Sequence, residues 1–118
     1  MIGLEHYLIL SGILFSIGLY GALTKRNLVV ILMCIELMFN GVNVAAVAMS
    51  RHLVPLSLVR DAAATTDQAI QMLLTGQVFA VFVITVAAAE VALGLGIILA
   101  IYRSRDTAEA GDVDLMRR

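Results

Sequence analysis

The sequence predicts an all-α membrane protein with three transmembrane helices. Of its 118 residues, 61% are hydrophobic and 14% are charged, and the mean hydropathy is +0.97. A chain this short cannot bury so many apolar residues in one core, so lipid or neighbouring proteins must cover the rest. Three long apolar runs carry the excess, and such isolated runs can cross a bilayer only as helices, which satisfy their own backbone groups. We expect residues 1–118 to form one integral membrane domain.

The first predicted helix covers about residues 4–24. Glu5 precedes its apolar run, and the basic residues Lys25 and Arg26 follow it. This charge order is the reverse of that in a cleaved signal peptide, so the segment is predicted to stay as an anchor. Only three residues, Lys25 to Asn27, separate this run from the next. The first two helices are therefore expected to form an antiparallel hairpin.

The other two transmembrane helices are predicted at about residues 28–49 and 77–102. Both apolar runs are long enough to cross ~30 Å of hydrocarbon at ~1.5 Å per residue. An outer loop, residues 50–76, connects them. We expect this loop to hold a short helix over Asp67–Leu74 with Thr66 as its cap.

The distribution of Lys and Arg predicts the orientation of the chain. The side that holds the first turn and the tail, residues 103–118, carries six basic residues, and the other side carries two. The six are Lys25, Arg26, Arg103, Arg105, Arg117 and Arg118; the two are Arg51 and Arg60. Since positive charge favours the cytoplasmic side, we expect the N-terminus outside and the C-terminus in the cytoplasm.

Charge and motifs exclude several classes of function. The net charge of −1 gives no basic field for nucleic acid. Cys34 is the only cysteine, so no internal disulfide can form, and no cluster has metal-ligand spacing. No glycine-rich phosphate loop or dinucleotide motif is present. We expect a chain that binds no metal and no cofactor of its own.

Two glutamates lie in the middle of apolar runs and are the main candidates for chemistry. Helical rise puts Glu36 roughly 14 Å and Glu90 roughly 20 Å from the cytoplasmic ends, so their levels differ by about 6 Å. Loss of water favours the protonated form of a carboxyl group, which allows it to accept and release a proton. The competing explanation is a static ion pair with another subunit, because this chain has no intramembrane Lys or Arg.

Polar residues near Glu36 predict a polar face on the second helix. Glu36, Asn40 and Asn43 are spaced i, i+4 and i+7, which is one side of an α-helix. We expect this face to point toward protein or water rather than lipid.

Other features indicate packing or solvation. Ala88, Ala92 and Gly96 form a small-residue stripe that we expect to pack against another helix. His6 and His52 lie near the outer boundary, where solvated or interfacial positions are expected rather than a role in proton transfer.

Two stretches together indicate a family. "KRNLVVILMCIELMFNGVN" and "GQVFAVFVITVAAAEVALGLGIILAIYR" closely resemble the K subunit family of bacterial proton-pumping NADH-quinone oxidoreductase, the counterpart of the 4L-type subunit of mitochondrial and chloroplast complexes. The resemblance covers roughly residues 1–50 and 76–103. A basic pair before Asn27, a glutamate nine positions later, and Ala-Ala-Ala-Glu in the last helix make it specific.

The resemblance implies a subunit in the membrane arm of this complex, in a bacterial cell membrane, beside the A, J and H subunits and an antiporter-like N-type subunit. FMN, iron–sulfur clusters and quinone would then belong to other subunits, with no redox centre in this chain. It also implies that Glu36 is the main residue of a proton path, that Glu90 is a second member, and that Lys25 and Arg26 affect activity.

The family expectation leaves alternatives. The outer connection looks longer than the short link expected for the family, and the tail varies between lineages. A small C-type subunit of multisubunit cation/proton antiporters has a similar three-helix plan, but is expected to lack the pair of intramembrane glutamates. A small drug exporter would show four spans. A purely structural assembly subunit remains if the carboxylates are inert.

Overall fold

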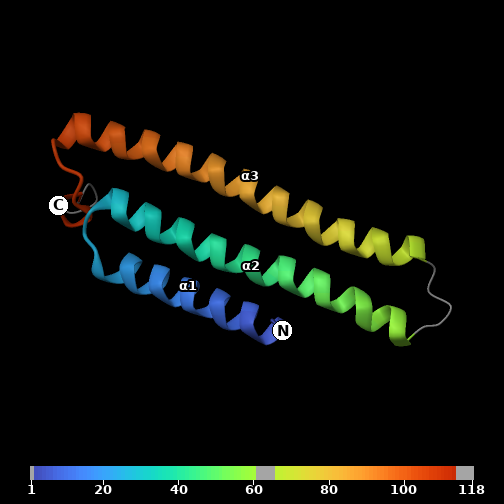
Figure 1. Cartoon of the computed structure of the whole chain (residues 1–118). Coiled ribbons are helices and arrows are strands. Elements are labelled where there is room, and N and C mark those ends of the chain that lie inside the picture. The colour runs from blue at the N-terminus through green and yellow to red at the C-terminus, as the bar shows by residue number, and fades with distance from the viewer. Residues whose placement is uncertain (1, 61–65, 114–118) are drawn as a thin grey trace.

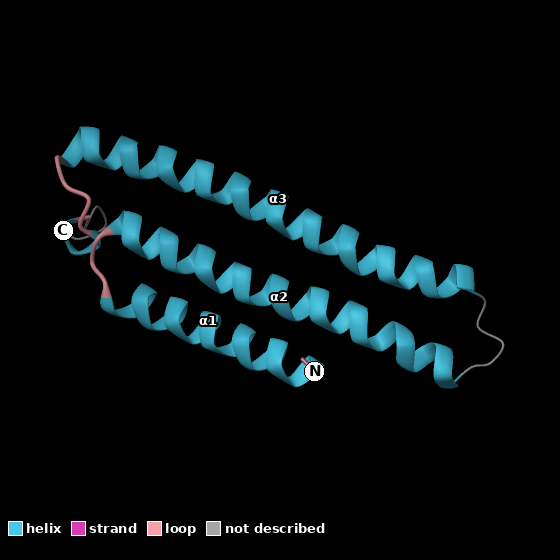
Figure 2. Cartoon of the chain, in the orientation of Figure 1, coloured by secondary structure: helices cyan, strands magenta, loops and turns pink. Residues whose placement is uncertain are grey.

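Three long helices make up nearly all of the computed structural model, which describes residues 2–60 and 66–113 (Figures 1 and 2). They are α1 (Leu4–Thr24), α2 (Leu28–Arg60) and α3 (Thr66–Arg105), followed by a 3₁₀ turn, η1 (Ala110–Asp112). All three helices are long and apolar enough to cross a membrane. The predicted all-α architecture and the number of spans are confirmed.

The helices lie side by side, with α2 in contact with both α1 and α3 (Figure 1). Neighbouring helices run antiparallel, so the expected first hairpin is confirmed. The molecule is elongated and measures 66 × 24 × 24 Å. The turn between α1 and α2 and the end of α3 lie at one end of the bundle. α1 is shorter than α2 and α3, so its start lies short of the opposite end.

The helix ends differ from the prediction on the side of the long connection. α2 continues to Arg60 and α3 begins at Thr66, so most of residues 50–76 is helical, and the short helix expected over residues 67–74 is the first part of α3. Residues 61–65 lie outside the described part. The difference arises because backbone hydrogen bonding continues into the polar flank of an apolar run. At about 50 Å for α2 and 60 Å for α3, both exceed the hydrocarbon thickness.

Glycines allow α1 and α2 to pack closely. A Cβ added at Gly18 would lie 2.6 Å from the carbonyl oxygen of Cys34, and one added at Gly41 would lie 3.0 Å from that of Ser11. At the contact between Ser11 and Gly41, the Ser11 hydroxyl also donates a hydrogen bond of 2.7 Å to the Gly41 carbonyl oxygen. This combination of small residues and an interhelical hydrogen bond is typical of helix pairs in membranes.

The contact between α2 and α3 also relies on small residues. Ala80, Ala87 and Gly94 follow one another at intervals of seven along α3, and both alanines are buried. A Cβ at Gly94 would lie 2.9 Å from a methyl carbon of Leu32 on α2. A seven-residue step turns only about 20° around an α-helix, so these positions form one straight seam.

The small-residue stripe predicted to pack lies outside this seam. Ala88, Ala92 and Gly96 are exposed, and nothing lies within 4 Å of a Cβ added at Gly96. Four residues turn about 40° more than one full turn of an α-helix. Successive residues of such a stripe therefore rotate away from the face that meets a helix lying alongside. The expectation that it packs is wrong within this chain.

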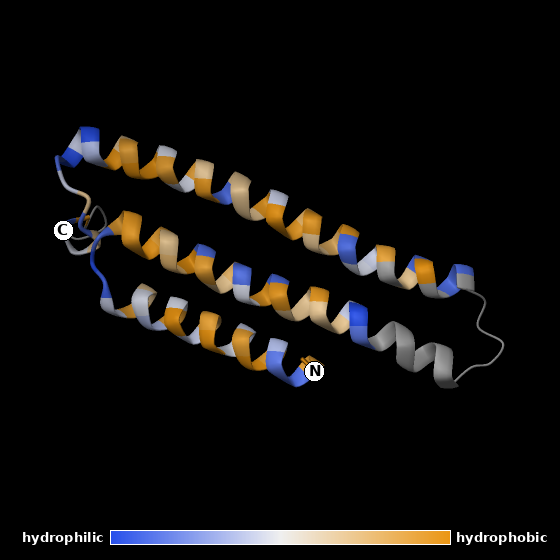
Figure 3. Cartoon of the chain, viewed as in Figure 1, coloured by the Kyte–Doolittle hydropathy of each residue, from blue (hydrophilic) through white to orange (hydrophobic). Residues whose placement is uncertain are grey.

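Large apolar side chains remain on the outside of the bundle. Figure 3 shows hydrophobic residues along the length of every helix, with hydrophilic ones at the ends and at a few positions midway along α2 and α3. Isoleucines, leucines and phenylalanines such as Ile9, Phe82 and Leu99 are exposed, whereas the buried hydrophobic residues among those described are alanines. A helix that is apolar on all sides is typical of a membrane span.

The first testable consequence concerns Gly18. Gly18→Ala should lower the thermal stability of the assembled protein by about 1–3 kcal/mol, because the new methyl group meets a backbone carbonyl on α2. The matched control is Gly12→Ala on the same helix, where nothing lies within 4 Å and where alanine should stabilise the helix by about 0.5–1 kcal/mol. The measurement is the melting temperature of the purified assembly. Equal melting temperatures for the two variants would contradict this account of the α1–α2 contact.

Candidate functional site

The register between α2 and α3 places Glu36 and Glu90 at the same level. Leu32 lies opposite Gly94, and Glu36 follows Leu32 by four residues while Glu90 precedes Gly94 by four. Because the helices are antiparallel, both steps lead the same way along the bundle. A second contact near the far end, between Ser50 and Gly76, gives the same register.

Glu36 lies half-buried in the groove between α2 and α3. It lines a cavity of about 410 Å³ together with Leu32, Asn40, Val91 and Leu95. Apolar side chains dominate this lining, so the carboxyl group has few neighbours that could solvate its charge. A carboxyl group placed here can be reached only through this cavity or along the groove between the two helices.

Glu90 lies at the margin of the seam and is exposed on the surface of the chain. It falls three residues after Ala87 and four before Gly94, yet it does not line the cavity that holds Glu36. The structure therefore brings the two glutamates to one level but not into one cavity. An exposed carboxyl group at the middle of a span must be covered by protein or water, because contact with lipid costs several kcal/mol.

The two asparagines of the predicted polar face lie in different surroundings. Asn40 is exposed and lines the cavity of Glu36. Asn43 is buried, with 8% of its surface exposed, and its Oδ1 atom has no hydrogen-bond partner among the described residues. Asn43 lines a second cavity nearer the start of α1. The polar face thus borders two cavities rather than one.

Lys25 and Arg26 are exposed in the turn between α1 and α2. The N–H of Lys25 donates to the carbonyl oxygen of Gly21 at 3.0 Å, which ends α1. Asn27 then begins α2, because its Oδ1 atom accepts a hydrogen bond of 2.9 Å from the N–H of Val29. The basic pair is therefore held between two well-defined helix ends.

The tail after α3 folds back and pairs with this turn. The N–H of Ala110 donates to the carbonyl oxygen of Arg26, and the N–H of Leu28 donates to that of Ala108, each at 2.8 Å. Asn27 and Glu109 form an antiparallel bridge between these bonds. The sequence does not predict this pairing, since two isolated hydrogen bonds between distant segments leave no periodic pattern.

Metal binding finds no support in the part of the chain that is described. No group of three or more His, Cys, Asp and Glu side chains in residues 2–60 and 66–113 could hold a metal ion. Cys34 is half-buried and lies against Gly21 on α1, where it contributes to packing.

The three apolar helices leave a carboxyl group and most large hydrophobic side chains uncovered. These features define a small multi-pass membrane subunit, one that functions within a larger assembly. The chain belongs to the family of NADH-ubiquinone/plastoquinone oxidoreductase chain 4L, whose family model matches residues 6–118. The resemblance found in the sequence is confirmed.

Relatives named NADH-quinone oxidoreductase subunit K match along nearly their whole length. The protein of that name from Methylacidiphilum infernorum is 47% identical over 116 residues, which cover 98% of this chain and 97% of the relative. One from Geobacillus sp. (strain WCH70) is 46% identical, with 97% and 94% covered. The "subunit K 2" of Geobacter metallireducens is 44% identical, with 99% of each chain covered.

These matches have two consequences. The chain is a subunit of an NADH-quinone oxidoreductase complex, so other subunits of that complex are its partners. In addition, the expectation that the outer connection, residues 50–76, is unusually long for the family is wrong for these relatives. Alignment over nearly the full length of both chains leaves no room for a large insertion in this one.

The register between α2 and α3 can be tested by cross-linking. With Cys34 replaced by serine, cysteines at Leu32 and Gly94 should form a disulfide on mild oxidation, because a disulfide needs Cβ atoms about 3.5–4.5 Å apart. Cysteines at Leu32 and Ala87 serve as the control pair, displaced by about 10 Å along α3. Loss of free thiols, measured by mass spectrometry, reports the bond. Cross-linking of the control pair alone would show that the register is shifted.

The pairing of the tail with the first turn leads to a separate prediction. Ala110→Pro removes the N–H that donates to Arg26, at a cost of about 0.5–1.5 kcal/mol, so trypsin should cleave after Lys25, Arg26 and Arg105 several times faster in open membrane fragments. Ala110→Gly keeps the N–H and is the control. If both variants are cleaved at the parent's rate, the tail does not protect the turn.

Proposed function

We propose that this chain forms part of the membrane arm of a proton-translocating NADH-quinone oxidoreductase, and that Glu36 and Glu90 belong to a proton path coupled to electron transfer from NADH to quinone. The observation that carries the proposal is the register, which puts one carboxyl group on each of two packed helices at the same membrane level. Two acids so arranged can exchange protons through water or a bridging side chain.

The energetic demand limits how such a pair can work. Each proton that moves outward opposes about 2.3 kcal/mol per 100 mV of membrane potential. A carboxyl group with one fixed proton affinity cannot drive this movement, so its surroundings must alternate between two states. The position of Glu36 suits this role, since it is half-buried and lines a cavity between α2 and α3 whose shape depends on how the two helices pack.

The exposure of Glu90 supports a contact with a neighbouring subunit. We assign this contact to the other membrane-arm subunits, of the A, J, H and antiporter-like N types. A neighbour that brings water or a titratable group to Glu90 would extend the path, whereas a fixed cation would make the static ion pair considered above. The first arrangement is the one proposed, because nothing in this chain neutralises either acid within the spans.

The proposed orientation places the turn at Lys25 and Arg26 in the cytoplasm, with the N-terminus outside a bacterial plasma membrane. Hydrogen bonds between this turn and the start of the tail hold Lys25 and Arg26 at the end of the bundle where α3 ends with Arg103 and Arg105, which supports the orientation inferred from the count of Lys and Arg. The exposed basic pair then lies at the cytoplasmic end of the path, where it can attract the counter-charges of neighbouring subunits. FMN, iron–sulfur clusters and quinone are assigned to other subunits, and no redox centre to this one.

Replacement of Glu36 by glutamine tests the proposal. Glu36→Gln keeps the size and polarity of the side chain but cannot release a proton, so NADH-driven proton pumping in membrane vesicles should fall about 10²-fold or more. Glu90→Gln should cause a smaller loss. Glu5→Gln, at the exposed start of α1, is the matched control and should pump normally.

Assembly of the complex is verified for each variant by native gel before pumping is compared. Full pumping by an assembled Glu36→Gln variant would sink the proton-path role and leave an assembly subunit. A loss confined to sodium-dependent transport would instead favour the antiporter alternative.

A further inference from the structure

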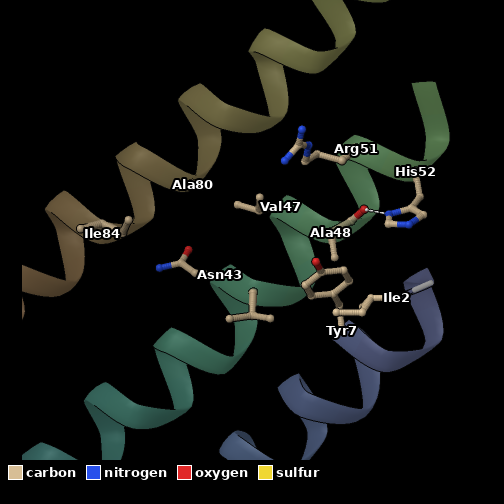
Figure 4. A pocket seen from close by; sticks show the side chains of 10 residues that line it. Ile2, Tyr7, Asn43, Val47, Ala48, Arg51, His52, Ala80 and Ile84 are labelled. Carbon is tan, nitrogen blue, oxygen red and sulfur yellow. Dashed lines mark hydrogen bonds between the residues drawn. The ribbon is translucent and has the colours of Figure 1, made fainter. Parts of the chain in front are cut away.

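A second cavity lies at the end of the bundle where α1 begins, between residues of all three helices (Figure 4). Its volume is about 610 Å³. Tyr7 from α1, Asn43 and His52 from α2, and Ala80 from α3 are among its lining residues. The proposed orientation puts this cavity in the outer half of the membrane, on the far side of Glu36 from the cytoplasm.

The inner end of this cavity holds a polar group that needs a hydrogen-bond donor. Asn43 is more than nine-tenths buried and projects between α2 and α3, where its Oδ1 atom finds no partner among the described residues. A buried carbonyl oxygen without a donor destabilises the folded chain. The Oδ1 atom is closed off as the helices stand, so a small donor such as water reaches it only when α2 and α3 move slightly apart, whereas the acyl chain of a lipid has no hydrogen to donate.

The outer end of the cavity is polar and basic. Arg51 and His52 follow one another there, and Tyr7 lies beside His52 with 6.2 Å between the ring centroids. The Nδ1 atom of His52 lies 2.9 Å from the carbonyl oxygen of Ala48 (Figure 4). Since a carbonyl oxygen can only accept, Nδ1 carries a hydrogen, which leaves Nε2 as the nitrogen through which the ring can take up and release a proton.

We propose that this cavity is the water-filled outer exit of the proton path, with Asn43 ordering water at its inner end and His52 passing protons to the outside. The inference rests on the proposed function of Glu36. A volume of 610 Å³ has room for roughly 20 molecules at about 30 Å³ each, and the polar side chains supply the partners that ordered water requires.

The transfer conserves protons at every step. The Glu36 carboxyl group gives its proton to a water molecule and becomes a carboxylate. The excess proton moves by bond exchange along the water toward the outer end. Nε2 of His52 takes up a proton to form the imidazolium ion, which returns to the neutral ring when it releases that proton to outer water. The Glu36 carboxylate is then reprotonated from the cytoplasmic side.

The separation between the two cavities gives the path a point of control. Asn40 lines the cavity of Glu36 and Asn43 lines the exit, three residues and about 4.5 Å further along α2. Water must cross this short step before a proton can leave. A change in the packing of α2 against α3 at this level would open or close the path, which supplies the alternation that pumping requires.

Thiol labelling tests whether the exit is hydrated. In a Cys34→Ser background, Val47→Cys places a thiol in the cavity, and Leu93→Cys places the control thiol on an exposed apolar position of α3. A cationic, membrane-impermeant methanethiosulfonate is added outside intact cells that carry the full complex. Val47→Cys should react about tenfold faster or more than Leu93→Cys, because the reactive thiolate forms only where water is present.

Three outcomes would overturn the proposal. Labelling of Val47→Cys only after detergent treatment would show that lipid fills the cavity. No labelling in either condition would show that a neighbouring subunit fills it, and labelling only in inside-out vesicles would show that it opens to the cytoplasm. The same treatment should also lower NADH-driven pumping in Val47→Cys, where the cation is attached, but not in Leu93→Cys. His52→Phe should slow pumping even when no labelling reagent is added.

Parallel measurements on Glu36→Gln distinguish a failure of the proposed exit from a failure of the proposed proton-path role of Glu36. If Glu36→Gln pumps fully, the proton-path role of Glu36 fails, while labelling still reports whether the cavity holds water. If Glu36→Gln loses pumping and both labelled Val47→Cys and His52→Phe pump fully, only the exit is refuted.

Discussion

Close packing of α3 against α2 fixes the level of every polar group in the middle of the bundle. Ala80, Ala87 and Gly94 present almost no side chain, so the helices approach until Leu32 fills the space above Gly94. With that contact set, antiparallel geometry leaves no freedom in the level of Glu90 relative to Glu36. Larger residues on the seam would spread the helices and enlarge both cavities, so the packing controls how much water can reach the acids.

The three helices cover only some of the side chains that must be kept from unfavourable contact with lipid. Alanines supply its buried hydrophobic residues, while isoleucines, leucines and phenylalanines face outward beside Glu90. Lipid can cover the apolar groups but not a carboxyl group, which requires protein or water at that level. The cost of an uncovered Glu90 therefore favours assembly with neighbouring subunits. In this way one residue can serve both as a proton group and as a reason for the subunit to stay in its complex.

The sequence was sufficient for the helices, the hairpin and the similar depth of the two acids, because hydrophobic length and helical rise depend on local residues alone. It was insufficient where distant segments meet. The prediction for the stripe at Ala88 was wrong because residue spacing does not say which side of α3 faces α2. The exposure of Glu90 depends on this same rotation of α3 about its own axis. The ends of α2 and α3 were misplaced because an apolar run marks the membrane rather than the helix. Relatives aligned over nearly their full length corrected the expectation that the connection at residues 50–76 is long for the family.

The tail that pairs with the first turn has a consequence for how the protein is made. Synthesis proceeds from the N-terminus, so α1, the turn and α2 have left the ribosome before Ala108 and Ala110 exist. The carbonyl of Arg26 and the N–H of Leu28 have no partners in the tail until residues 108–110 have been translated. Closure of this end thus comes after all three helices have been made, and a chain truncated after α3 would leave the turn without these hydrogen bonds.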